Sequence, residues 1–267
     1  MAPLFVSDLL DAGQMGYPSD PNKDSRMNRR LELLLFLALA IALTFIPILS
    51  VPLKWFETLF HETSHALAAV LTGGSVDQIS LAFDGSGLAT TLGGIHFITA
   101  WAGYAGALAW GALLYAMGSA MDRSTVRWTT GGLLMGGLLL LVFWLQWNLA
   151  SLAIMAVLLT ILGLMLHPWA TKLAKPLLRL MGAFVLVSAI VSPSYLLQTD
   201  QPNDAATLAS MTGIPAIVWA VGWMGLGVLT TLALFWWEGK SQRHHALSAR
   251  FQVRKTPRWK FWANGFH

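Results

Sequence analysis

Two histidines and a glutamate in the stretch His61-Glu62-Thr63-Ser64-His65 have the types and the spacing that metal-dependent hydrolysis requires. Residues four apart on a helix share one face, with their Cβ atoms about 6 Å apart, so both imidazoles can reach one metal ion. Glu62 then lies beside the metal without binding it, where its carboxylate can take a proton from water and return it to a leaving amine. The spacing therefore predicts a hydrolytic zinc site with His61 and His65 as ligands and Glu62 as the general base.

A third ligand must come from elsewhere, because catalytic zinc normally has three protein ligands and an open position for water. The chain has no cysteine, so the ligand must be a histidine or a carboxylate. The candidates are Asp204, Asp200 and His96, in that order. Asp204 is favoured because it lies just before the last apolar segment, where a carboxylate can project into a helix bundle. The alternative is that Asp204 caps the N-terminus of that helix.

The composition places these residues in a membrane protein. Hydrophobic residues make up 55% of the 267 residues and charged residues only 11%, whereas soluble domains carry about a quarter charged residues. A membrane-spanning helix needs about 20 mainly apolar residues. Six stretches approach that length: 31–49, 95–117, 128–147, 149–166, 181–197 and 214–237.

Between the first two of these stretches lies a more polar segment, Leu53–Leu71, which carries the histidine motif and is expected to be a helix that ends at Gly73 and Gly74. After it, apolar and polar residues alternate from Gln78 to Phe83, and a turn-forming cluster precedes residues 88–92. This pattern predicts a β-hairpin, with a polar re-entrant loop as the alternative. The expected fold is all-α, with about six transmembrane helices, the motif helix and this small hairpin or re-entrant segment.

We expect one membrane-embedded domain, residues 31–238, between a polar N-terminal tail (1–30) and a basic C-terminal tail (239–267). The basic loops at 123–127 and 172–179 and the basic tail are expected to face the cytoplasm, since lysine and arginine concentrate there in membrane proteins. Both termini are then cytoplasmic, provided that the region 53–94 enters and leaves on one side. We attribute the net charge of +4 to this orientation and expect no nucleic-acid partner.

The motif also carries a resemblance. Several short segments are similar to those of the site-2 protease family of intramembrane zinc metallopeptidases. They are His61 to Leu67, Gly73-Gly74, Gly85-Ser86-Gly87, Gly103-Tyr104-Ala105-Gly106, Asn203-Asp204-Ala205 and Thr212-Gly213-Ile214-Pro215. The resemblance is greatest to its compact bacterial branch, which lacks a PDZ insertion. It implies that His61, His65 and Asp204 bind zinc, that Glu62 is the catalytic base, and that the chain lies in a bacterial plasma membrane.

The expected activity is therefore hydrolysis of transmembrane or membrane-anchored protein substrates within the lipid bilayer, as in regulated intramembrane proteolysis. The alternative is a non-proteolytic membrane protein, either a metal-binding protein such as a di-iron enzyme or a scaffold that retains the motif. Metal content separates the first of these from a zinc peptidase.

Overall fold

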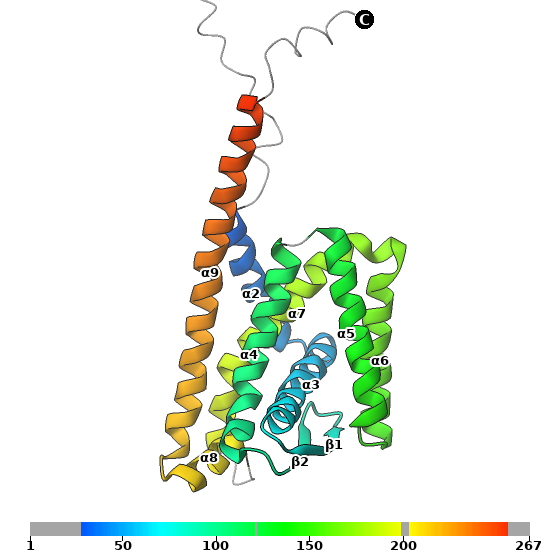
Figure 1. Ribbon diagram of the computed structural model, residues 1–267, viewed down its shortest axis with the longest axis vertical. Helices are drawn as coiled ribbons and strands as arrows, with labels where there is room; N and C mark the ends of the chain where they lie inside the picture. Colours follow the sequence, from blue (N-terminus) through cyan, green and yellow to red (C-terminus); the bar gives the residue numbers. More distant parts are fainter. Residues whose placement is uncertain (1–27, 121, 199–202, 256–267) are drawn as a thin grey trace, which may run out of the picture.

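The computed structural model describes residues 28–120, 122–198 and 203–255, and it confirms an all-α membrane fold with one small sheet. Five of its helices are long and apolar enough to cross a membrane: α4 (His96–Ala120), α5 (Arg123–Phe143), α6 (Leu149–Leu166), α7 (Thr171–Val191) and α9 (Ala216–Lys255). Figure 1 shows α4, α5, α6, α7 and α9 running between the two ends of the molecule, with α3 among them.

The first predicted span is broken. α2 (Arg29–Thr44) ends before Phe45, and α3 (Pro47–Leu71) leaves it at an angle of 111°. Pro47 explains the break, because proline disfavours the helical conformation for the residue before it, and Ile46 adopts φ −117° and ψ 87°. The helix expected over 31–49 therefore ends at Thr44, and residues 47–49 belong to α3. α2 and α3 form one bent pair, which is either a broken span or a re-entrant segment.

α7 begins earlier than the apolar pattern indicates. The predicted span 181–197 is a helix over Thr171–Val191, followed by the 3-10 helix η2 (Ser192–Gln198). Arg179 lies inside α7 because its charge is satisfied there by Glu32 of α2, with Nη1 and Oε2 2.8 Å apart. At the other end of the chain, α9 continues to Lys255, so the first part of the expected basic tail is helical.

The predicted hairpin is present. β1 (Ser75–Leu81) pairs antiparallel with β2 (Gly87–Leu92), and the register shifts between Val76 and Gln78. The outer edge of β1 bonds to the α5–α6 connection, since the Ile79 N–H donates to the Trp144 carbonyl at 2.6 Å. β2 lies beside α3, so the hairpin packs between the motif helix and the α5–α6 pair.

α4 and α7 form the centre of the bundle. Their backbones approach closely at Gly111 and Gly182, where an added Cβ would meet backbone atoms of the other helix. Small residues of this kind permit close helix packing in membranes. α4 therefore packs closely on α7, and it also packs against α3, the helix that carries the motif.

Candidate metal centre

α3 presents both motif histidines to the same point in space. Their rings lie edge to face with centroids 4.7 Å apart, and the Nε2 atoms are 3.0 Å from each other. The helix ends at Leu71, and Gly73 follows it with a φ of 87°, a conformation that glycine adopts without strain. His61 and His65 therefore lie on one face of the helix, as predicted.

Asp204 reaches this point from α8 (Asp204–Thr212). Its Oδ2 lies 3.1 Å from Nε2 of His61 and 3.3 Å from Nε2 of His65. Asp204 does not cap its helix, because that position belongs to Asn203, whose side chain accepts a hydrogen bond from the Ala206 N–H at 3.0 Å. With Asn203 as the cap, the Asp204 carboxylate is left to face the histidines.

These three side chains fit a zinc ion. Their ligand atoms all lie within 4.8 Å of one another. Zinc ligands about 2.0–2.1 Å from a tetrahedral ion lie about 3.3 Å apart, close to the 3.0, 3.1 and 3.3 Å measured here. Two imidazole nitrogens and one carboxylate oxygen are also a donor set of the type that catalytic zinc sites use. The cluster could therefore hold a metal ion.

The backbone of α4 orients one of the ligands. Nδ1 of His65 lies 2.7 Å from the carbonyl oxygen of Thr99, and a carbonyl can only accept, so Nδ1 carries the proton and donates it. This tautomer leaves the lone pair of Nε2 directed at the cluster. A hydrogen bond of this kind is the usual support of a metal-binding histidine.

Glu62 is held beside the cluster by the hairpin. Its Oε2 accepts a hydrogen bond of 2.7 Å from the Ala89 N–H of β2, and the residue is buried. Gly87 of the same strand allows this approach, because an added Cβ there would lie 2.8 Å from Cγ of Glu62. The hairpin therefore fixes a carboxylate that is next to the histidines in sequence and is not one of the three clustered ligands.

The cluster and Glu62 line one cavity of about 760 Å³. Its walls come from α3, the hairpin, the first turns of α4, η2 and α8. Tyr104 of α4 forms part of the wall and packs edge to face on His61, with centroids 4.6 Å apart. The cavity is large enough for a peptide segment beside the three ligands.

The structure tests one of the other two candidate ligands. His96 begins α4 and lines the cavity, but it is not among the clustered ligand atoms, and Asp200 lies outside the described residues. Sequence reasoning missed the Thr99 carbonyl and the Ala89 N–H, because backbone groups leave no signal in residue type. Tyr104 did leave a signal in the sequence, because it is a tyrosine within an apolar span.

Gly103 has a role at the centre that its sequence context did not reveal. An added Cβ at this position would overlap both imidazoles, at Nε2 of His65 and Cε1 of His61. Gly103 is therefore needed for more than ordinary helix packing, since it gives the rings their space.

We predict that Gly103→Ala lowers zinc affinity about 10- to 100-fold, the range found when groups that position metal ligands are changed. The measurement is competition with a chromophoric chelator. Gly131→Ala is the matched control, because this helical glycine has open space where a Cβ would be added. Equal zinc affinity of the two variants would contradict the role assigned to Gly103.

Comparison with known proteins places this geometry in a family. The model of the Peptidase M50B-like family matches residues 34–237, which include the motif, the hairpin and Asp204. Neither the curated proteins nor the solved structures gave a match. The family match covers most of the chain, so the resemblance to site-2 proteases is confirmed. With five apolar helices of spanning length in its described residues, the chain is a multi-pass membrane protein that belongs to the Peptidase M50B-like family of metallopeptidases.

Proposed function

We propose that this protein is an intramembrane zinc metallopeptidase that hydrolyses peptide bonds of membrane-anchored proteins. One observation carries the proposal: the ligand atoms of His61, His65 and Asp204 lie within 4.8 Å of one another, beside Glu62 in a single cavity. Ionisable residues at membrane depth are costly and are generally functional. The family match supports the same reaction class.

Each residue has a distinct part in this proposal. Zinc held by the three ligands would supply Lewis-acid chemistry, which makes water acidic and polarises a carbonyl. Glu62 accepts the proton that the attacking water loses and delivers it to the leaving amine nitrogen. The Ala89 N–H keeps one oxygen of Glu62 in place, so that the other can exchange the proton.

The outer edge of β2 is the proposed site for the substrate backbone. In an antiparallel ladder successive residues direct their N–H and C=O groups to alternate sides, and the Ala89 N–H points away from β1 toward Glu62. Thr91 lies two residues after Ala89 in β2, so its backbone N–H and C=O groups point to the same side and face the cavity that Thr91 lines. An extended peptide added to this edge would lie beside Glu62. A helical substrate must unwind to bind in this way.

We predict that Thr91→Pro lowers cleavage at least about tenfold, because proline removes an outward N–H from the edge without removing a bond to β1. Zinc content should be unchanged. Thr91→Ala is the matched control, since it removes the side chain and keeps the N–H. If the two variants cleave equally well, the substrate does not bind this edge as a strand.

The proposal is tested with purified protein in liposomes and a panel of single-span membrane proteins. We expect about one zinc and no iron per chain, cleavage of some panel members, loss of cleavage with a zinc chelator, and recovery on adding zinc. Stoichiometric iron would instead support an oxygen-activating metalloprotein. Cleavage that a chelator does not affect would contradict the metallopeptidase assignment, provided that metal analysis shows the zinc to be gone.

A further inference from the structure

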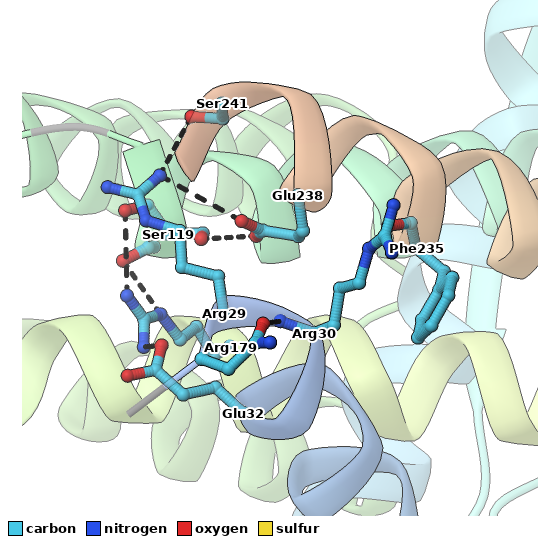
Figure 2. A network of polar contacts seen from close by, with 10 residues as sticks. Arg29, Arg30, Glu32, Ser119, Arg179, Phe235, Glu238 and Ser241 are labelled. Carbon is cyan, nitrogen blue, oxygen red and sulfur yellow. Dashed lines mark hydrogen bonds and ion pairs between the residues drawn. The ribbon is translucent and has the colours of Figure 1, made fainter. Parts of the chain in front are cut away.

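Charged side chains join four helices at one end of the bundle. Arg29 of α2 donates to the Ser241 hydroxyl of α9 at 2.9 Å and lies 3.8 Å from Oε2 of the buried Glu238. Arg179 of α7 donates to Oε2 of Glu32 and, at 3.0 Å, to the Gly118 carbonyl near the end of α4. Figure 2 shows this network between α2, α4, α7 and α9. The network therefore holds these four helices together at one end of the bundle.

Within the described residues, nearly all the positive charge belongs to segments at that end. Lys54 aside, every lysine and arginine of the described residues lies within 28–30, 123–127, 172–179 or 240–255. The second of these segments directly follows α4, the third is the start of α7, and the fourth continues α9 beyond Ser241. Two of them, 123–127 and 172–179, are the first turns of the spanning helices α5 and α7. Lysine and arginine near the ends of spanning helices set the orientation of a membrane protein.

The opposite end carries the hairpin and the active-site cavity. The α5–α6 connection reaches this end, where the Gln146 N–H donates to the Ile79 carbonyl of β1 at 2.8 Å. The hairpin contains two acidic residues, Asp77 and Asp84, and no basic residue. The Ser86 N–H and hydroxyl donate to the Asp84 carboxylate and hold its pKa below the usual value, so Asp84 is charged at neutral pH. Figure 1 shows the hairpin and α8 together at this end, away from α2.

α4 gives the depth of the metal cluster. Its 25 residues rise about 37 Å, enough to cross the hydrocarbon core. Gly103, which touches both histidine rings, is seven residues from the start of α4 at His96, or about 10 Å along the axis. The cluster therefore lies inside the membrane, and it is nearer to the hairpin end than to the charged network.

From this distribution we infer that the catalytic cavity serves the non-cytoplasmic face of the membrane. Lysine and arginine concentrate in cytoplasmic loops, so the end with the charged network faces the cytoplasm and the hairpin end faces away from it. Building on the proposed peptidase function, this orientation also defines a substrate class. The substrates are membrane proteins with an extended or easily unwound segment near the non-cytoplasmic end of a span, because only such a segment reaches the β2 edge without crossing the bilayer.

The absence of cysteine from the chain allows a direct test by thiol labelling. Ser75→Cys places one thiol at the start of β1, and Ser124→Cys places one in the first turn of α5; both serines are exposed, and neither lines the cavity. With a membrane-impermeant maleimide, we expect the Ser75→Cys variant to react in intact cells and the Ser124→Cys variant to react in sealed inside-out vesicles.

The reverse pattern would overturn the inference, as would reaction of the Ser75→Cys variant in inside-out vesicles alone. Labelling in detergent shows that each thiol is reactive, and the cysteine-free parent gives the background. Because labelling does not depend on cleavage, the result separates the orientation of the cavity from the peptidase activity. A protein with the expected orientation and no proteolysis would refute only the proposed function.

Discussion

Glu62→Gln is expected to reduce peptide hydrolysis about 10²- to 10⁴-fold, the contribution that a positioned general base typically makes, while zinc remains bound. The substitution keeps the shape of the side chain and removes the group that exchanges the proton. Glu62 is not among the clustered metal ligands, so the change should leave the metal site intact. The glutamine side chain can still accept the Ala89 N–H through its amide oxygen, which preserves the contact between α3 and β2.

The measurement is the rate of product formation from a cleaved panel substrate, together with zinc content, for wild type and variant. Asp77→Asn is the control for loss of one negative charge, because Asp77 is exposed at the irregularity of β1 and does not line the cavity. If the protein is a scaffold that retains the motif, neither substitution should change its function. Wild-type cleavage by the Glu62→Gln protein would exclude Glu62 as the base.

The local parts of the site could be predicted from sequence because they depend on one helix. The spacing of His61 and His65 determines that they share a face, and the glycines after Leu71 determine where that helix stops. The hairpin followed from alternation of apolar residues and a turn cluster. These inferences need only neighbours in the chain, and the structure confirms the geometry of each.

The remaining features depend on partners far away in the sequence. Arg179 interrupts an apolar pattern, yet it lies in α7 because Glu32 and the Gly118 carbonyl satisfy it. The bend at Pro47 follows from proline chemistry, but its angle of 111° does not follow from the local sequence, because α2 and α3 pack on helices that come later in the chain. The sequence also left it open whether Asp204 is a helix cap or faces the cluster, and the answer is decided by the neighbouring Asn203.

Asp204 of α8 lies against the two histidines of α3 in the proposed zinc site, so its replacement is expected to have the second large effect. Among the described residues, Asp204→Ala removes the one clustered ligand that does not come from α3, and it leaves two imidazoles with Nε2 atoms 3.0 Å apart. Changes to groups that merely support a metal ligand cost about 10- to 100-fold in affinity. Loss of a ligand itself should cost more than about 100-fold, and cleavage should fall with the zinc content. α8 should persist, because its cap is Asn203.

Asp200→Ala is the matched comparison for this experiment, because the same residue type is removed four positions earlier in the chain. We expect the Asp200→Ala protein to keep its zinc and its activity, and the Asp204→Ala protein to lose both while its far-UV circular dichroism stays unchanged. Zinc analysis after dialysis against a weak chelator distinguishes the two variants. If Asp204→Ala keeps stoichiometric zinc and Asp200→Ala loses it, the third ligand is Asp200, and the approach of Asp204 to the histidines has another purpose. Asp204 belongs to α8, which lies at the same end of the bundle as the hairpin, so the proposed zinc site and the inferred orientation of the cavity both depend on that end.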